Sequence, residues 1–355
     1  MTILAEDYDY VIGGDPDRDT IDLAVLDTAT GGLRAHLEAP ADGAGYAHML
    51  DWARDHAPGR RVWALEGTGS FAAGLAGELA LAGEDVVEVG ALKHARGAKN
   101  DRLDAVRAAR TAMAREHQSS PRVRGLREAI RALAATRQAV LVSRTKAINE
   151  LKSLIVVSPE ALRALLRGRP LAAQLTLIES MSTPAPATVD HRVTVLTLQS
   201  IASRIRFLTG QLADIDPELA RLVQEHPAGP ALLVEPGVGP VVAAQLLISW
   251  SHPGRVRSDA AFASLAGVAP LEASSGQRTR HRLNRGGDRA LNRALHTVAI
   301  TRFRCHAETR AYEARRTLQG KTHRDIRRCL KRTLARHLYR VMEAAAASHS
   351  VPSAS

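Results

Sequence analysis

The chain has 355 residues, is 45% hydrophobic and carries a formal net charge of +11. Its apolar stretches, such as residues 71–82, are interrupted by Gly and Glu and fall short of the roughly 20 residues that span a bilayer, which argues against a membrane protein. The acidic first ten residues are unlike a signal peptide, and two cysteines, Cys305 and Cys329, are too few for a disulfide framework, so we expect a protein of the reducing cytoplasm.

The net charge is divided unevenly along the chain. Residues 1–92 contain 17 acidic and 5 basic side chains, whereas residues 278–340 contain 19 basic and 4 acidic ones. Of those 19 basic residues, 17 are Arg, whose guanidinium group binds phosphate with two parallel hydrogen bonds. A solvated helical surface would interleave Glu with Lys, so this imbalance favours a polyanionic partner, above all nucleic acid.

The acidic N-terminal part of the chain, residues 1–92, has the hydrophobic pattern of an α/β domain. Alternating residues and turn signals predict strands at 8–13, 21–26 and 33–38, then a helix at 45–56, a strand at 62–65, a helix at 71–81 and a strand at 86–89. Three strands in a meander, followed by alternating helix and strand, are the order of an RNase H-like domain.

Carboxylates stand at the ends of these predicted elements. Asp15 follows the first strand, Glu66 ends the fourth, and Asp101 and Asp104 share one face at the start of the next helix. Four acids in one place could hold two magnesium ions, which clamp the attacking and leaving oxygens of a phosphodiester displacement. Each acid alone could be a surface carboxylate, and Asp101 could be a helix cap. Their combination with the strand order favours the metal site.

The middle of the chain reads as long helices. Apolar residues recur three and four apart over 126–155, where Arg137 and Arg144 interrupt the seam, and again from Leu198 to Ile215. We expect the second helix to end at Asp216-Pro217, where a new helix can begin. The Pro- and Ala-rich residues 183–187 predict a loop, so the two helices form an antiparallel coiled-coil pair that either dimerises the protein or folds back on itself.

The basic C-terminal part of the chain contains a Gly-x-Gly turn, Gly237-Val238-Gly239, before an apolar helix at 241–248. Such a turn between helices can expose backbone N–H groups to a phosphate, as in a helix-hairpin-helix element that grips nucleic-acid backbone without reading sequence. A plain tight turn is the alternative.

Residues 277–289 alternate Arg with neutral side chains, which predicts a short extended hairpin with one cationic face. The arginines concerned are Arg278, Arg280, Arg282, Arg285 and Arg289. Basic helices are expected to begin at Asn292 and Arg293, with Leu291, Leu295 and Val298 facing the core. Ser274-Ser275-Gly276, just before this stretch, would by itself be an ordinary loop.

Taken together, these motifs resemble the DEDD-type transposases of the insertion sequence one-ten family, the bridge-RNA-guided recombinases. The resemblance covers nearly the whole chain and is carried by Glu66-Gly-Thr-Gly69, Lys99-Asn-Asp-Arg-Leu-Asp-Ala105, Pro236-Gly-Val-Gly239 and the stretch from Phe262 to Arg293. It implies a RuvC-like metal-binding domain at 1–117, a helical coiled-coil region at 118–228 and a mainly α transposase domain at 229–346, followed by a disordered tail at 347–355.

The resemblance also implies roles for individual residues. Asp15, Glu66, Asp101 and Asp104 match the metal-binding tetrad for Mg²⁺, and Ser274 or Ser275 matches the nucleophile; we prefer Ser275 because Gly276 leaves room for a phosphate. The first strand departs from the family pattern, with Pro16 after Asp15 and two further acids, Asp17 and Asp19, close by. Gly237, Gly239, the five arginines above and Arg293 are the expected nucleic-acid contacts.

The expected partners are donor and target DNA and a guide RNA, in a homodimer or homotetramer of the bacterial cytoplasm associated with the nucleoid. No nucleotide cofactor is expected, because a phosphoseryl link would conserve the energy of the broken bond. The few aromatic residues, 3% of the chain, suit backbone contacts by Arg better than base stacking. Two alternatives stay open: a RuvC-type nuclease that uses metal and water alone, and a non-catalytic nucleic-acid scaffold.

Overall fold

The computed structural model describes residues 4–90, 101–115, 119–182, 188–272, 281–284 and 286–349. Two compact units divide the chain: Met1–Arg124 with Trp250–Ser258, and Gly125–Ser249 with Asp259–Ser355. The helical region and the transposase domain, expected to be separate, thus fall within one unit. Within the described ranges, no helix combines the length and the apolar character that crossing a membrane requires.

The first unit is built on a five-stranded sheet with the order β3-β2-β1-β4-β5. Its strands are β1 (Tyr10–Pro16), β2 (Thr20–Asp27), β3 (Leu33–Pro40), β4 (Arg61–Glu66) and β5 (Asp85–Val89). β1, β2 and β3 form an antiparallel meander, and β4 and β5 continue the sheet in parallel with β1. The predicted mixed α/β domain is confirmed, with strand bounds close to those read from the alternation.

Helices cover both faces of this sheet because both faces of its central strands are apolar. α2 (Gly43–His56) and α3 (Ala73–Leu81) share a core cluster with Ile12, Trp63 and Leu65 on one face. α1 (Leu4–Asp7), which the sequence did not suggest, and α4 (Asp101–Met113) pack with the alternate residues, such as Val11 and Ala64, on the other face. We refer to this second side as the α4 face of the sheet.

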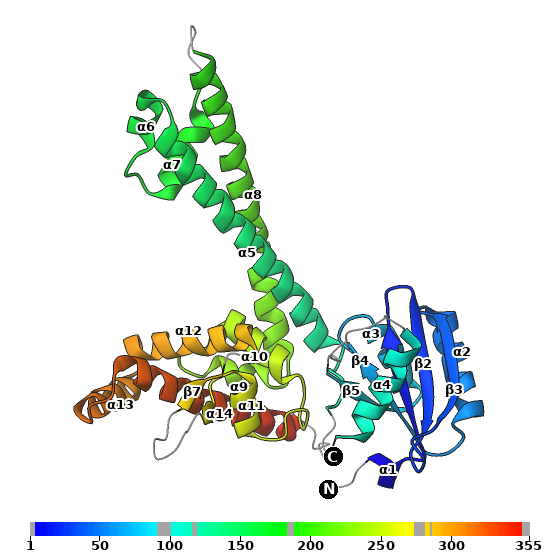
Figure 1. The fold of residues 1–355 in the computed structure, drawn as a ribbon. Helices are drawn as coiled ribbons and strands as arrows, with labels where there is room; N and C mark the ends of the chain where they lie inside the picture. The colour runs from blue at the N-terminus through cyan, green and yellow to red at the C-terminus, as the bar shows by residue number, and fades with distance from the viewer. Residues whose placement is uncertain are drawn as a thin grey trace, which may run out of the picture. The chain divides into compact units, whose positions relative to one another are not determined.

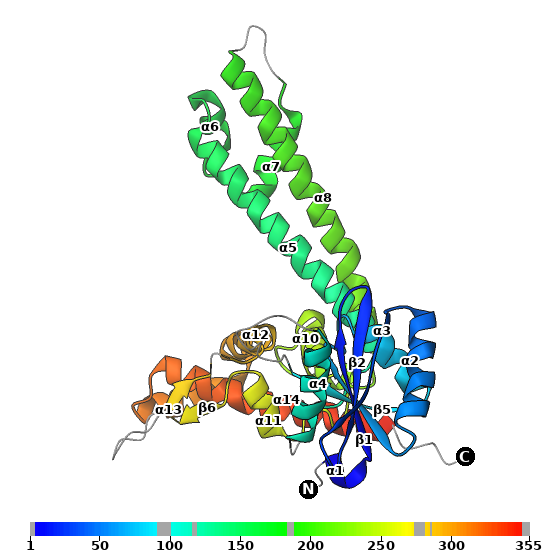
Figure 2. The ribbon, with the colours of Figure 1, turned by 45° about the vertical axis from the view of Figure 1, so that its right-hand side comes forward.

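The second unit contains two long helices that run antiparallel to one another, α5 (Leu126–Val157) and α8 (Val189–Glu225), with α6 (Glu160–Leu166) and α7 (Leu171–Ser180) between them in the chain (Figures 1 and 2). Leu198, Ile201 and Ile205 of the predicted seam are buried against α5 and α7. The two arginines that interrupt the seam have polar partners: Arg137 pairs with Asp216 at 2.5 Å, and Arg144 donates to Thr209 at 2.7 Å. The expected loop at 183–187 lies outside the described residues.

The expected helix end at Asp216-Pro217 is wrong, because α8 continues through Pro217 to Glu225. A proline inside a helix loses one backbone hydrogen bond and disturbs the preceding turn, at a cost of about 3 kcal/mol. Two contacts hold the last turns in place: the Arg137–Asp216 ion pair, and the burial of Leu219 and Val223. Tertiary packing therefore overrides the local stop signal.

The rest of the second unit is a cluster of shorter helices with one small hairpin. Its helices are α9 (Gly229–Leu233), α10 (Pro240–Trp250), α11 (Asp259–Leu265), α12 (Arg289–Cys305), α13 (Ala307–Leu318) and α14 (His323–His349); β6 (Pro270–Glu272) pairs with β7 (His281–Leu283). Leu291, Leu295 and Val298 are fully buried, as predicted.

Two expected boundaries in this part are wrong. Arg289 belongs to α12 and not to the hairpin, because the carboxylate of Asp288 accepts hydrogen bonds from the backbone N–H groups of Ala290 and Leu291 and so caps the helix there. Residues 347–349, expected in a disordered tail, continue α14.

Candidate active site

Asp15 and Glu66 stand side by side at one edge of the sheet. β1 and β4 are parallel neighbours, and the last pair in their register is Gly14 with Leu65, so each acid follows directly after it. Side chains alternate between the two faces of a sheet. Val11 on β1 and Val62 and Ala64 on β4 pack on the α4 face, which places Asp15 and Glu66 on that same face.

Gly13 brings α4 close to this edge. A Cβ atom at Gly13 would lie only 2.0 Å from the carbonyl oxygen of Ala105 and 2.7 Å from the amide nitrogen of Ala109. The helix backbone therefore crosses β1 directly over Gly13, two residues before Asp15. Asp104, which precedes Ala105 in α4, is carried to the same end of the sheet.

Asp104 is buried, with only 4% of its surface exposed, and its carboxylate accepts a hydrogen bond from the Arg107 guanidinium at 2.5 Å. A buried carboxylate is stable when such a partner satisfies it, and this one is held with a defined orientation. Asp101 begins α4 one turn earlier, but its side chain lies outside the described part of the structure.

A further acid on the α4 face, Asp22, was missed by the sequence reasoning. Asp22 of β2 lies directly opposite Asp15 in the antiparallel register, so the two side chains share a face. It is 8% exposed, and its carboxylate is 2.9 Å from the imidazole Nε2 of His36 on β3. The sequence did contain a signal for Asp22, because this acid stands between Ile21 and Leu23 in a strand whose inner residues are otherwise apolar and buried on both faces.

The turn after Glu66 is sharp and partly closed. Gly67 has φ +64°, which favours glycine, and Ser70 donates its backbone N–H to the Gly67 carbonyl at 2.7 Å. Thr68 is 4% exposed, and among the described residues its hydroxyl oxygen has no hydrogen-bond partner. A buried hydroxyl beside Glu66 is a group that a ligand or a water molecule could satisfy.

Asp17 and Asp19, the neighbouring acids, lie differently. Both follow β1 in the exposed connection to β2, where Asp19 pairs with Arg18 at 2.8 Å and Asp17 accepts from the Arg18 backbone N–H. Asp15, inside β1 and partly buried, is thus the acid of the three that lies in the sheet.

The donor set on the α4 face fits a hard cation, because Asp15, Glu66 and Asp104 offer only carboxylate oxygens, which Mg²⁺ prefers. In the parts of the chain that the structure covers, no three His, Cys, Asp or Glu side chains are gathered closely enough to form a ready metal site.

The structure describes some, but not all, of the residues in the second unit that were predicted to bind nucleic acid. Gly237 has φ +82°, and a Cβ there would be 3.2 Å from the Val298 carbonyl oxygen, so this glycine allows α12 to approach; Gly239 has open space around it. Arg302 fixes the turn by donating to the Pro236 carbonyl at 2.7 Å and to Glu235 at 2.8 Å.

Arg289 and Arg293 lie on α12, and Arg282 lies in β7 with its side chain undescribed. Ser274, Ser275, Arg278, Arg280 and Arg285 lie outside the described residues.

Comparison with known proteins gives two family matches in chain order. Residues 12–157 match a transposase family model of the DEDD type from IS110, and residues 230–314 match the model described as transposase IS116/IS110/IS902 family.

Two similar relatives were found. One, from Streptomyces coelicolor, is the insertion element IS110 uncharacterized 43.6 kDa protein, 31% identical over 146 residues, which are 41% of this chain and 35% of the relative. The other, a probable family 20 transposase of Pseudomonas aeruginosa, is 27% identical over 219 residues, which are 60% of this chain and 62% of the relative. The matched segments thus cover less than two thirds of either relative.

The α/β sheet with carboxylates at one edge and the first family match define a DEDD-type transposase domain, a class that suggests an RNase H-like fold and a divalent metal. The second match, at residues 230–314, is to a transposase model that also names IS110. The chain belongs to the IS110 family of transposases.

Proposed function

We propose that this protein is a DNA transposase that cuts and rejoins strands with a serine nucleophile and Mg²⁺. The observation that carries the proposal is the placement of Asp15, Glu66 and Asp104 at one end of the α4 face, from two adjacent strands and the helix that crosses them. The family membership supports the same reaction class.

The proposed roles follow from the chemistry of these groups. Asp15, Glu66, Asp104 and Asp101 would hold the metal, which when bound supplies charge neutralisation at the scissile phosphate. Ser275, or Ser274, would attack the phosphorus through its hydroxyl oxygen. A bond forms between that oxygen and phosphorus, the bond from phosphorus to the departing sugar oxygen breaks, and the serine proton ends on that sugar oxygen.

Rejoining reverses these bond changes with a different sugar hydroxyl, so the number of phosphodiester bonds is conserved and no nucleotide cofactor is consumed. Exchange of paired strands needs at least two copies of the chain, and we propose a homodimer or homotetramer. We also propose that a guide RNA selects donor and target DNA. The excess of Arg over acids in residues 278–340 supports contact with nucleic-acid backbone.

Substitution of the two serines tests the nucleophile. Ser275→Ala is expected to abolish both strand cleavage and the covalent protein–DNA adduct, because no hydroxyl oxygen is left to attack. The measurement is cleavage of a labelled DNA substrate with its RNA in Mg²⁺, followed by denaturing electrophoresis that resolves the adduct.

Ser274→Ala is the matched control, since it removes an adjacent hydroxyl and should leave both products unchanged. The reverse pattern would assign the nucleophile to Ser274. Cleavage that survives both substitutions, with no adduct in the wild type, would instead indicate a RuvC-type nuclease that uses water.

A further inference from the structure

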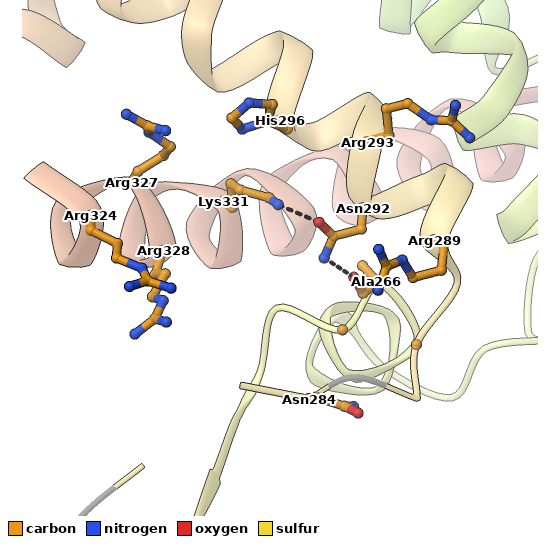
Figure 3. A pocket seen from close by; sticks show the side chains of 12 residues that line it. Ala266, Asn284, Arg289, Asn292, Arg293, His296, Arg324, Arg327, Arg328 and Lys331 are labelled. Atoms are coloured by element: carbon orange, nitrogen blue, oxygen red, sulfur yellow. Dashed lines mark hydrogen bonds between the residues drawn. The ribbon is translucent and has the colours of Figure 1, made fainter. Parts of the chain in front are cut away.

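A cleft of about 690 Å³ lies between α12 and α14 in the second unit (Figure 3). Six cationic side chains line it, and no acid lines it among the described residues: Arg289 and Arg293 from α12, and Arg324, Arg327, Arg328 and Lys331 from α14. The sequence pattern singled out the two arginines of α12, whereas nothing in it distinguished the four cations of α14. The cleft therefore brings together two charged segments about 30 residues apart.

Hydrogen bonds and a close backbone contact hold the residues at the base of the cleft in place. Lys331 donates to the side-chain oxygen of Asn292 at 2.5 Å, and the side-chain nitrogen of Asn292 donates to the carbonyl of Ala266 at 2.7 Å (Figure 3). Beside this chain of hydrogen bonds, a Cβ at Gly287 would lie 2.4 Å from the backbone nitrogen of Gly267, so only glycine allows this approach. The ammonium group of Lys331 is thus oriented by its neighbours before any ligand binds.

Positive charge dominates the cleft: among the described residues, Asp325 pairs with Arg328 at 3.7 Å, and Lys331 and Arg327 lie close enough to affect each other's charge. Burial, and secondly the charge of Arg327, lower the pKa of Lys331. The Nε–H group of Arg327 is buried and has no hydrogen-bond partner within the described structure. Leaving a buried donor unsatisfied costs free energy, and so does holding like charges together. An anion in the cleft would relieve both costs.

A second hollow of about 430 Å³ shares Gly267, Asn292, Arg328 and Lys331 with the first. It adds Arg316, Lys321 and Arg332, with Asp325 as its acid, and the buried Nε–H of Arg316 likewise has no partner among the residues described. Two adjoining cationic hollows suit a ligand with repeated negative charges better than a single ion. Among the described residues, neither hollow is lined by Phe, Tyr or Trp, so the ligand would be held mainly by its charges and not by base stacking.

We propose that the cleft between α12 and α14 binds the sugar–phosphate backbone of a single nucleic-acid strand, with successive phosphates in the two hollows and Lys331 between them. The proposal rests on the proposed function, since it names the part of the molecule that holds the strand. Arg and Lys from both helices donate to phosphate oxygens regardless of sequence. Because the contacts are to phosphates, the strand can be either DNA or RNA, provided that its phosphates are accessible.

Loss of the α14 cations tests the cleft. The double variant Arg327→Gln/Arg328→Gln, in the full chain, is expected to weaken binding of a 30-nucleotide single strand by about tenfold or more. The slope of log affinity against log salt should fall by about 0.7 for each phosphate contact removed. The measurement is fluorescence anisotropy with labelled DNA and with RNA of the same sequence, in EDTA so that no cleavage occurs.

The matched control is Arg304→Gln/Arg310→Gln, which removes the same charge from exposed positions outside both hollows. It should change affinity less than about twofold. Thermal unfolding shows whether the double variant is folded. If it is not, Lys331→Gln is a second cleft variant, and it should also weaken binding of the strand. Weakening for one strand type alone identifies whether DNA or RNA occupies the cleft, and equal weakening identifies the shared backbone.

Cleft variants that fold and bind as tightly as the wild type would overturn the inference while leaving the transposase proposal intact. Conversely, wild-type protein that binds strands through the cleft but never cleaves DNA in Mg²⁺ would refute the proposed function and not the cleft.

Affinity should also depend on pH through His296, which lines the first hollow. Partial desolvation, then the charges of Lys331 and Arg327, lower the pKa of His296. From α14 it faces Lys331, Arg327 and Arg324, and on α12 its neighbours are Arg293, Asn292 and Arg289.

A bound phosphate would raise the pKa of His296, so binding takes up a proton between its free and bound pKa values. Affinity should rise as pH falls through that interval, by up to about tenfold for each unit of the difference. His296→Gln should flatten the profile, measured by the same anisotropy assay between pH 5 and 8 (roughly the range in which histidines titrate). An unchanged profile would place the phosphates away from His296.

Discussion

Glu66→Gln is expected to reduce DNA strand cleavage by at least about 10²-fold, because the amide keeps the shape of the side chain but removes the charge that would hold the metal. Glu66 ends β4 beside Asp15, on the face where Asp104 is already buried. The fold should survive, since Glu66 lies at the edge of the sheet and the core positions of β4 are Val62 to Leu65. The measurement is single-turnover cleavage at saturating DNA and RNA.

Glu78→Gln on the exposed side of α3 is the matched control, with the same chemical change and an expected rate within twofold of the wild type. Thermal unfolding gives a readout that does not depend on activity. Saturating Mn²⁺ or Mg²⁺, at roughly 100 times the dissociation constant, should stabilise the wild type and Glu78→Gln by about 2.7 kcal/mol, and Glu66→Gln far less. Equal cleavage and equal metal stabilisation in the two variants would remove Glu66 from the site.

The sheet and its edge could be predicted from the sequence because the signals there are local. Alternation of apolar and polar residues fixes the strands and their faces, and the acids Asp15 and Glu66 follow two such strands directly. Parallel pairing of β1 and β4 then places the two acids side by side without any long-range information beyond the strand order. The same reasoning located Leu291, Leu295 and Val298 in the core.

Features that depend on contacts distant in sequence could not be predicted. Asp22 joins the acidic edge only because β2 pairs with β1 in a particular register. α8 continues through Pro217 because Asp216 pairs with Arg137, which lies 79 residues earlier in the chain. The cationic cleft exists because α14 packs beside α12, and spacing within either helix does not reveal which arginines meet. The composition showed that residues 278–340 are basic, but it did not show which of these charges lie close together in the fold.

Gly13 links the fold to the site, because it is where the backbone of α4 meets β1. Gly13→Ala is expected to destabilise the first unit by about 3 kcal/mol, since the added methyl group would collide with backbone atoms of Ala105 and Ala109, which no rotamer change can move. Lifting α4 off the sheet would also carry Asp104 away from Asp15 and Glu66. We therefore expect cleavage to fall even at temperatures where the variant is fully folded.

Two further glycines make the prediction specific to that contact. A Cβ at Gly14 would meet the end of the Leu65 side chain at 2.5 Å, which can rotate away, so Gly14→Ala should cost only about 1 kcal/mol. Gly43, at the start of α2, has nothing within 4 Å, and Gly43→Ala should change stability by less than about 0.5 kcal/mol. Chemical denaturation of the three variants should give the order Gly13, Gly14, Gly43 from most to least destabilised. Equal stability of Gly13→Ala and Gly43→Ala would mean that α4 does not cross β1 at Gly13, and the placement of Asp104 beside the two strand-end acids would be lost with it.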